Sequence, residues 1–431
     1  MKKSRLQNYV CVQVCISLLL ICVCCAGKSE KHMKEENDVG EVEETIGEVI
    51  LDEKGVEIID LGSNYKLSNE PFPMSEIVDA SDVQYIKLET TDDALLPLLG
   101  QMKVVDDQIF LTEPYAFQYV YQFNKNGKFI NRIGKIGQGP GEYKLAMGFT
   151  VDDTSVYLPI IDANYMYVYD RNGNYERKIE GCLYTQSLTS RNDKLILARG
   201  QHCYNQDIFS FLIFDKTGKL EYKHKPEVSN GLINQNRWSF SYQTTPITQT
   251  KEHILLFEIV DNYIYEVTDQ LHRPCYKIDM GAYAMPLEYI SKTSVDKKDY
   301  FRYFSLVGLF ETSNDIFFRI GYGYEFSDNC IARFNKQSKK IQFWKQPEYL
   351  GEKQNDILYN DIDGGPSYVI RNNLDDPNYL YVLIYPHMAE KYLEKWRDKT
   401  VKYPEKRAVL CKLLSQMQEE DNPILVLYKK K

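Results

Sequence analysis

The sequence contains few of the residue patterns that mark metal centres and hydrolytic sites. Its 431 residues include only six histidines, with no HExxH motif and no paired spacing that suits zinc. No GxSxG motif of a serine nucleophile occurs either. Five of the ten cysteines lie within residues 1–25, and the other five have no short regular spacing, so we predict neither a disulfide framework nor a CxxC metal knuckle. We therefore expect no metal ion and no cofactor.

The chain also lacks an excess of basic residues. Its formal net charge is -9, and it becomes -12 if the leader with Lys2, Lys3 and Arg5 is removed. Nucleic-acid binding needs a concentrated basic surface that displaces counterions from phosphates. No basic stripe is visible in the sequence, so we expect no nucleic-acid partner.

The N-terminus has the pattern of an export signal. Residues 1–25 begin with basic side chains and continue as a short uncharged run rich in Leu, Ile, Val and Cys, which favours a cleaved signal peptide over a membrane span. The end of this run resembles a bacterial lipobox, with Cys25 as the preferred lipidated residue and Cys24 or Cys22 as alternatives. Residues 26–55 are highly charged and predict a flexible polar tether. We expect an exported protein held at the outer membrane by an N-terminal lipid; the alternative is a soluble secreted product.

Two kinds of segment recur along the mature chain, which is rich in Tyr (34) and Phe (19). The first is an acidic turn followed by an apolar strand, as in VDDQIFL at 105–111. The second is an aromatic hairpin with a tight polar turn, as in YVYQFNKNGKFI at 119–130, where Asn-Gly supplies the positive φ that a short hairpin requires. The spacing from Asp107 to Asp153 and Asp193 fits the period of propeller blades. Six such units predict an all-β, six-bladed β-propeller of four-stranded antiparallel blades over residues 56–431.

The sixth unit lacks an obvious third and fourth strand. Two helix-like stretches, within a helical insertion at about 386–420, separate its clear strand at 379–385 from a last strand at 423–428. An unpaired strand at 83–88 would supply the missing edge. We therefore predict that the N-terminal and C-terminal strands pair and close the last blade, which removes two open sheet edges.

Three segments carry a resemblance to a known family. They are GKIGQGPGEY at 134–143, NDIDGG at 360–365 and the ending EEDNPILVLYKKK at 419–431. Together with the leader, these segments resemble the six-bladed β-propeller lipoproteins, related to TolB-like and NHL-like propellers, of Gram-negative gut anaerobes. The resemblance implies a fold and a location in the cell envelope. It implies no activity and no catalytic residues.

The connections between strands predict two unlike faces. Within a blade whose strands are named A to D, the A–B and C–D turns are short, whereas the B–C and D–A connections are long and varied. Because long loops are usually functional or disordered, we predict that the long-loop face is the binding surface. The candidate residues on it are Gln138, Glu142, Tyr143, Arg199, His202, Tyr322, Tyr324, Asp361 and Asp363.

Each candidate motif also has a structural interpretation. Residues 134–141 do not open a helix with Gly-Lys-Ser/Thr, and Pro140 lacks one of the amides that would bind phosphate, so a blade connection explains them better than a P-loop. Asp361 and Asp363 could hold a structural cation or form a turn. Tyr322 and Tyr324 could stack on sugars or peptides, or pack between blades.

Three functions are consistent with the sequence. The first is a membrane-tethered recognition module without catalysis that binds a peptide, a glycan or a partner protein on the long-loop face. The second is a propeller enzyme, a hydrolase or lyase, with charged groups at the mouth of the central channel. The third is a structural scaffold in an envelope complex, which predicts a broad apolar patch.

Overall fold

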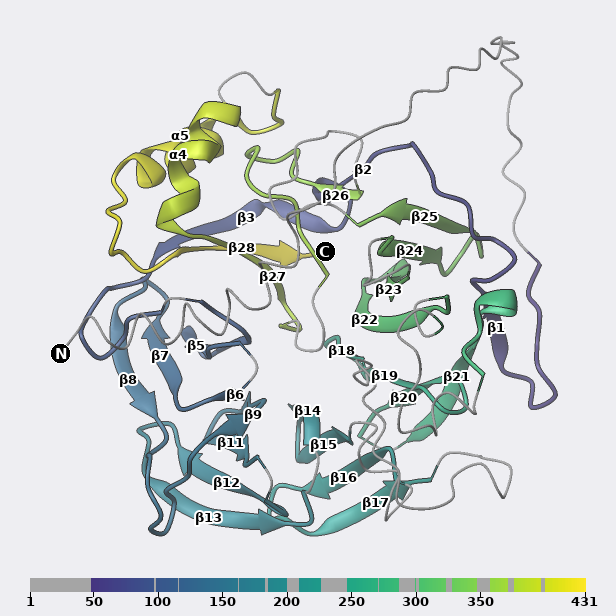
Figure 1. The fold of residues 1–431 in the computed structure, drawn as a ribbon, viewed down its shortest axis with the longest axis horizontal. Coiled ribbons are helices and arrows are strands. Elements are labelled where there is room, and N and C mark those ends of the chain that lie inside the picture. Colours follow the sequence, from purple (N-terminus) through teal and green to yellow (C-terminus); the bar gives the residue numbers. More distant parts are fainter. Residues whose placement is uncertain are drawn as a thin grey trace. The chain divides into compact units, whose positions relative to one another are not determined.

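The computed structural model describes residues 48–96, 98–114, 116–161, 163–182, 185–199, 209–225, 246–269, 271–286, 299, 302–322, 328–346, 357–370, 376–396 and 400–431. The chain divides into two units, residues 1–45 and 46–431, and all of the described residues belong to the second unit. In that unit, small sheets are arranged as a ring around a central axis (Figure 1). The predicted six-bladed β-propeller is confirmed.

The first three blades are consecutive four-stranded antiparallel meanders. Blade 1 contains β4 (Met102–Val105), β5 (Gln108–Leu111), β7 (Val120–Asn124) and β8 (Phe129–Ile133). Blade 2 contains β10 (Thr150–Val151), β11 (Ser155–Pro159), β12 (Tyr165–Asp170) and β13 (Tyr175–Glu180). Blade 3 contains β14 (Thr185–Arg191), β15 (Lys194–Arg199), β16 (Phe211–Asp215) and β17 (Leu220–His224).

Blades 4 and 5 keep the same order with one addition. Blade 4 contains β18 (Ile247–Gln249), β19 (Ile254–Glu258), β20 (Tyr263–Val267) and β21 (His272–Asp279), and β1 (Glu57–Asp60) joins it as a fifth, parallel outer strand. Blade 5 contains β22 (Ser305–Glu311), β23 (Asp315–Gly321), β24 (Cys330–Asn335) and β25 (Ile341–Lys345). Just before β1, Ile50 accepts a backbone hydrogen bond from Ile58, so the end of the expected tether already contacts blade 4.

Blade 6 is assembled from both ends of the folded unit. Its strands are β27 (Tyr379–Ile384), β28 (Ile424–Lys430) and β3 (Val78–Lys87), in that order, and β28 is antiparallel to both neighbours. The register places Val426 opposite Tyr85, which confirms the predicted pairing of the terminal strands. This blade has three strands among the described residues rather than the four predicted, because residues 360–370, the described segment nearest before β27, form no regular strand.

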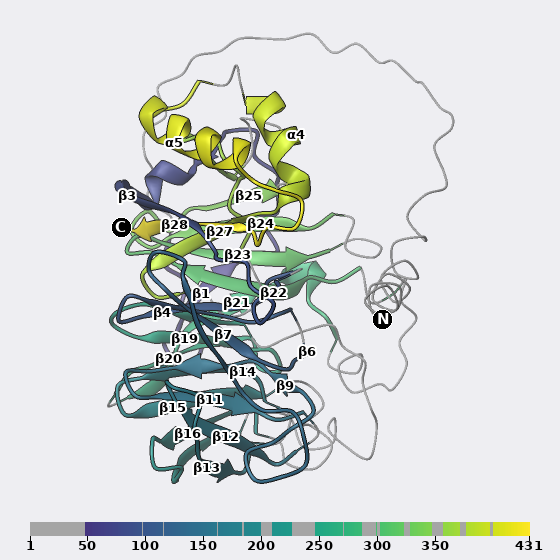
Figure 2. The same cartoon turned by 90° about the vertical axis from the view of Figure 1, so that its left-hand side faces the viewer.

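Two helices and two small sheets complete the described structure. The helices α4 (Pro386–Trp396) and α5 (Pro404–Ser415) lie between β27 and β28 in sequence, within the predicted helical insertion, and beside blade 6 (Figure 2). β6 (Ala116–Phe117) pairs with β9 (Ala146–Met147), and β2 (Phe72–Pro73) pairs with β26 (Ile357–Tyr359). Short 3-10 turns are η1 (Met74–Glu76) and η3 (Gly281–Tyr283).

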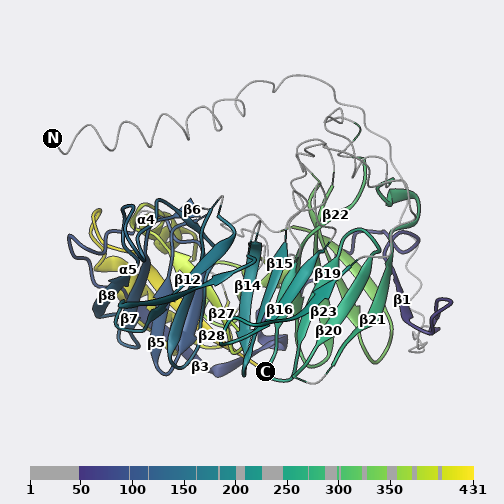
Figure 3. The same cartoon turned by 90° about the horizontal axis from the view of Figure 1, so that it is seen from below.

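Apolar side chains on both faces of each blade form the core. Strands such as β22 are buried at every position because each sheet is covered by a neighbouring sheet on either side. The core divides into clusters between adjacent blades; one of them joins Phe110 and Val120 of blade 1 to Val156 and Tyr169 of blade 2. The strands stand roughly along the axis of the ring, so their connections gather at its two ends (Figure 3). The fold therefore positions two sets of loops on opposite faces.

Candidate functional site

The A–B turns of blades 1 to 4 and the segment just before β27 of blade 6 meet around the axis on the short-turn face. Several turn residues adopt left-handed backbone conformations, with φ of 49° at Asp106, 59° at Asp107 and 46° at Asn192. Asp and Asn tolerate this conformation better than other residues with a side chain, because their short polar groups bond locally. The acidic turns in the sequence thus bend the chain sharply at the channel mouth.

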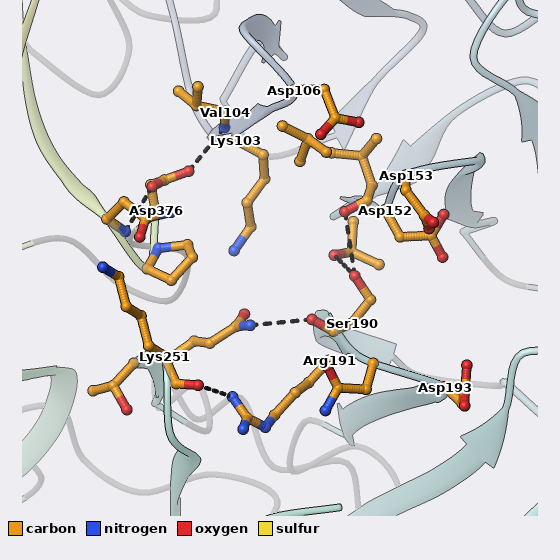
Figure 4. Close-up of a pocket in the computed structure, with 18 of the residues that line it drawn as sticks. Lys103, Val104, Asp106, Asp152, Asp153, Ser190, Arg191, Asp193, Lys251 and Asp376 are labelled. Atoms are coloured by element: carbon orange, nitrogen blue, oxygen red, sulfur yellow. Dashed lines mark hydrogen bonds between the residues drawn. The ribbon is translucent and has the colours of Figure 1, made fainter.

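An open cavity of about 730 Å³ lies at this mouth. Its wall consists of residues 103–106 of blade 1, 150–153 of blade 2, 190–193 of blade 3 with Lys216, 249–251 of blade 4 and 376–378 of blade 6. Figure 4 shows these residues surrounding the space, with the ammonium group of Lys103 directed toward its middle. A cavity of this volume is within the range that accepts a small-molecule ligand.

Hydrogen bonds between neighbouring blades hold the wall in place. Thr150 and Ser190 lie 3.1 Å apart at their hydroxyl oxygens, joining blades 2 and 3. Thr189 donates to the amide oxygen of Gln249 at 2.6 Å, joining blades 3 and 4. Asp376 of blade 6 accepts the backbone N–H of Val104 in blade 1 at 2.8 Å. The innermost strands are thereby fixed relative to one another, so the cavity is preformed.

The pKa values of two aspartates in the wall are shifted in opposite directions. Burial opposes ionisation of Asp152, but the N–H groups of Thr154 and Ser155 and the ammonium of Lys216, at 3.0 Å, outweigh it and lower its pKa. Burial raises the pKa of Asp376, against the opposing effect of the nearby Lys103 charge. Asp152 therefore remains a carboxylate fixed by its partners, while a proton on Asp376 is favoured by its surroundings.

The cationic side chains of the wall differ in their partners. Lys216 is paired with Asp152, and Arg191 donates to the backbone oxygen of Lys251 at 2.6 Å and lies 3.4 Å from Asp269. Lys103 is buried, with 5% of its surface exposed. Lys251 is exposed, and within the described part of the chain no carboxylate forms an ion pair with its ammonium.

The glycine-rich segment 134–143 forms a closed loop between blades 1 and 2. Glu142 accepts the N–H groups of Gln138 and Gly139 at 3.1 and 3.0 Å and pairs with Lys135 at 2.7 Å, which lowers the Glu142 pKa. Tyr143 is buried and donates to the backbone oxygen of Gln118. Of the predicted site residues in this loop, Gln138 is exposed, Glu142 is half-buried and Tyr143 is buried. The segment therefore forms a connection between blades 1 and 2, as predicted when a blade connection was preferred to a P-loop.

Position 141 of this loop requires glycine for two reasons. Its φ is +70°, and a Cβ placed there would lie 2.4 Å from the ring of Tyr175. The backbone oxygen of Gly141 also accepts a short hydrogen bond from Tyr169. The glycine is explained by close packing against blade 2 without any ligand.

Two more predicted residues are partly or wholly buried near the other end of the strands. Arg199 ends β15, at the opposite end from the Asp193 turn, is buried, and is not part of the cavity wall. Tyr322 is half-buried in an aromatic cluster in which its ring centroid lies 5.2 Å from Phe304 and 5.5 Å from Tyr283. Inter-blade packing thus accounts for much of the Tyr322 surface.

Asp361 and Asp363 are engaged within blade 6. Asp361 accepts the backbone N–H and hydroxyl of Ser75 at 3.0 and 2.6 Å and pairs with Lys402 at 2.9 Å. Asp363 is fully buried and accepts hydrogen bonds from Tyr85 at 2.6 Å, Tyr428 at 3.0 Å and the N–H of Gly365 at 2.8 Å. Both carboxylates therefore bind groups of the chain itself, and Asp363 does not face solvent as a binding-face residue would.

The remaining predicted residues, Cys25, His202 and Tyr324, lie outside the described residues. Within the described ranges, no group of three or more His, Cys, Asp and Glu side chains is arranged to hold a metal ion. No helix among those ranges is both long and apolar enough to cross a membrane.

Sequence reasoning missed the cavity on the short-turn face, although it identified most of the turns that form it. The recurring acidic turns, such as Asp106-Asp107 and Asp152-Asp153, were the available signal. Their length gave no reason to choose them over the longer loops. What makes them a site is their convergence on the axis, which depends on the ring.

Comparison with known proteins gives a family and a fold. The family model described as a domain of unknown function, DUF4934, matches residues 56–429. No curated protein matches the sequence. Among solved structures, one from Bacteroides fragilis described as a "Putative exported protein" is similar at a TM-score of 0.59 and 20% identity, covering 87% of this chain and 99% of its own.

Two further structures are less similar. A member of the DUF4221 family from Bacteroides vulgatus gives a TM-score of 0.42 at 11% identity, over 82% of this chain and 99% of its own. Virginiamycin B lyase from Staphylococcus aureus gives 0.37 at 14% identity, over 62% and 75%. Of these three structures, the Bacteroides fragilis one, at a TM-score of 0.59, supports the fold, and at 20% identity it carries no activity to this chain.

Proposed function

Because the chain belongs to the DUF4934 family, whose description assigns no activity, we propose from its geometry that it is a membrane-tethered binding module that takes a small polar molecule, or the end of a peptide or glycan, into the channel mouth. The observation that carries the proposal is the 730 Å³ cavity, whose wall is shared by five blades and cross-linked between them. A preformed cavity loses little entropy when it binds a ligand.

The wall favours binding over chemistry. Asp152 is held ionised by two amides and Lys216, and the oxygens of Asp376 accept the N–H groups of Val104, Asn378 and Tyr379. A general acid or base needs a mobile proton within reach of the substrate. Carboxylates already engaged in this way are suited to shaping the wall.

The proposal is tested by filling the cavity with a larger side chain. Asn378, half-buried in the wall, is replaced by Trp, and wild type and variant are compared by equilibrium dialysis against a panel of disaccharides, dipeptides and dicarboxylic acids. We expect at least one compound class to bind wild type and to lose about tenfold or more in affinity with Asn378→Trp. Ile136→Trp, on an exposed residue of the glycine-rich loop, is the matched control and should bind as wild type does. Binding that is unchanged in Asn378→Trp would place the site elsewhere.

The tether is part of the same proposal. It is supported by the lipobox-like end of the leader at Cys25 and by the similarity to a Bacteroides protein described as exported. In cells of a Gram-negative host, the protein should partition with the membrane fraction, whereas Cys25→Ser should appear in the soluble fraction. Membrane association that persists in Cys25→Ser but is lost in Cys24→Ser would move the anchor to the alternative cysteine.

A second binding surface, the long-loop face, has one observation in its favour. Tyr65, Tyr283 and Tyr322 are only half-buried in the aromatic cluster at that end of blades 4 and 5, so their rings could contact a peptide or a glycan. If partner proteins captured by crosslinking are lost with Tyr322→Ala but kept with Asn378→Trp, this face has a separate partner.

A further inference from the structure

Most of the aspartates of the wall lie on one side of the cavity. Figure 4 shows Asp106, Asp152, Asp153 and Asp193 on that side, while Lys251 lies on the other side with Asp376, and Lys103 reaches into the middle. The formal count of the wall residues is nearly balanced, with four cations and five aspartates. The electrostatic potential inside the cavity therefore depends on which of these charges are already paired with other groups of the protein.

The aspartates are neutralised or peripheral. Asp106 pairs with Arg171 at 2.6 Å, a residue outside the wall. Asp152 and Asp153 share Lys216 at 3.0 and 3.6 Å. Asp193 is exposed at the outer edge of the view in Figure 4. None of these four carboxylates leaves a strong negative charge at the centre of the cavity.

The lysines keep their influence on the cavity interior. Lys103 extends from the innermost strand of blade 1, and its ammonium group is directed toward the middle of the cavity (Figure 4). Lys251 extends from the A–B turn of blade 4 with no described carboxylate paired to it. Gln249 and Asn378 add neutral hydrogen-bonding groups to the same wall.

We propose that the ligand of this cavity carries an anionic group, a carboxylate, sulfate or phosphate, that binds at Lys103 and Lys251. This inference rests on the proposed function and names the chemistry of its ligand. Two lysines on flexible stems act as point charges, so they accept any of these anions without the planar geometry that arginine imposes. Because Lys103 is buried, its interaction with the anion is screened less by salt than a surface pair would be.

The test separates charge from size. Isothermal titration calorimetry compares trigalacturonic acid with its methyl ester, a probe of the same shape without charge, and includes inorganic phosphate and sulfate as free anions. We expect the acid to bind at least tenfold more tightly than the ester. Phosphate or sulfate that competes with the acid would identify a site for the anion itself, and failure of both to compete would assign the preference to carboxylates.

Variants assign the effect to the cavity. Lys251→Gln should weaken binding of the acid about tenfold and leave the ester unchanged, and Lys103→Gln should do the same provided that thermal unfolding shows it folded. The matched control is Lys345→Gln, an exposed lysine on the outer strand of blade 5. If the acid and the ester bind equally, or if Lys251→Gln binds the acid as wild type does, the inference is wrong. Binding of neutral compounds that Asn378→Trp still abolishes would then leave the proposed function intact.

Discussion

Blade 2 and blade 6 are both antiparallel sheets of the ring, and they are assembled by different routes. Blade 2 is one continuous segment, 150–180, whose strands follow one another through tight turns. Blade 6 combines β27 and β28 with β3 from the other end of the folded unit. Its strands come together through contacts such as the N–H of Asn422 to the hydroxyl of Thr90, which are 332 residues apart. Local turns thus determine one blade, and long-range contacts determine the other.

Polar side chains reflect the same difference. In blade 2, the half-buried turn residue Asp170 accepts the N–H groups of Asn172 and Asn174, its neighbours in sequence. In blade 6, Asn422 is buried and bonds to Thr90, Glu89, Ala94 and Leu96. A turn can lose one hydrogen bond and keep its conformation, whereas the hydrogen bonds of Asn422 hold together two segments that are far apart in sequence. Perturbations of blade 6 should therefore be the more damaging.

The largest effect is expected from removing the last strand. Deleting residues 423–431 removes β28, which lies between β27 and β3 and includes the fully buried Ile424, Leu425 and Val426. Both neighbouring strands would become open edges. We expect loss of the cooperative thermal transition measured by circular dichroism. Deleting Lys431 alone should preserve it, and a folded 1–422 protein would show that closure is dispensable.

Asp363→Ala should be the most damaging single substitution of those considered. It leaves three donors, from the buried Tyr428 and Gly365 and the half-buried Tyr85, without their acceptor. An unsatisfied buried polar group costs about 1–3 kcal/mol, and more when several share one acceptor, so a loss of about 3 kcal/mol in the free energy of unfolding is expected. Urea denaturation measures it. Tyr85→Phe removes one donor and should cost less, about 1 kcal/mol.

Gly173→Ala tests how strongly blade 2, which is formed by local turns, depends on one turn residue. Gly173 in the blade 2 hairpin has φ of +88°, and an added Cβ would lie 3.2 Å from the side-chain nitrogen of Asn131, a flexible neighbour. The backbone strain should cost about 1 kcal/mol in the free energy of unfolding, measured in the same urea experiment. A cost equal to that of Asp363→Ala would contradict the distinction between the two blades.

The smallest effect concerns a contact between neighbouring blades 4 and 5. His253 lies 2.7 Å from Glu311 and 3.3 Å from Glu266, and the Glu311 hydrogen bond raises its pKa above 6.5, although Lys336 and burial oppose this. The protonated imidazole thus stabilises the fold fully below pH 6.5, and this contribution is lost as the pH rises through the raised pKa. The difference in free energy of unfolding between wild type and His253→Gln should shrink over that range. A pH-independent difference would rule out the charge.

Much of the fold could be predicted from the sequence because hairpins are local. Asn-Gly and Thr-Gly turns between alternating strands fix the register of blades 1 to 3 within about 40 residues each. The pairing of 83–88 with 423–428 was predicted from the need to remove edges, and the register of Val426 with Tyr85 confirms it. The parallel β1 beside β21 was not predicted, since a four-residue strand without a turn partner carries no periodic pattern.

The site could be predicted far less well. The long loops led us to predict a site on one face, whereas the described cavity lies on the other face and is formed by short turns. Glu142, Asp361 and Asp363 have chemically suggestive side chains, yet each is bound by groups of the protein itself. Whether a carboxylate is engaged depends on partners far away in sequence, such as Ser75 for Asp361, and no local pattern encodes that.

By itself, the sequence determined the repeating hairpins, their turns and the number of blades, because alternation and turn chemistry act over a few residues. Only the tertiary structure decided which polar groups meet. Lys103 and Lys251 lie on blades 1 and 4, and closing the ring brings both to one cavity. The reason is physical: a hairpin forms through neighbours in the chain, whereas a site on the axis exists only when every blade is in its place.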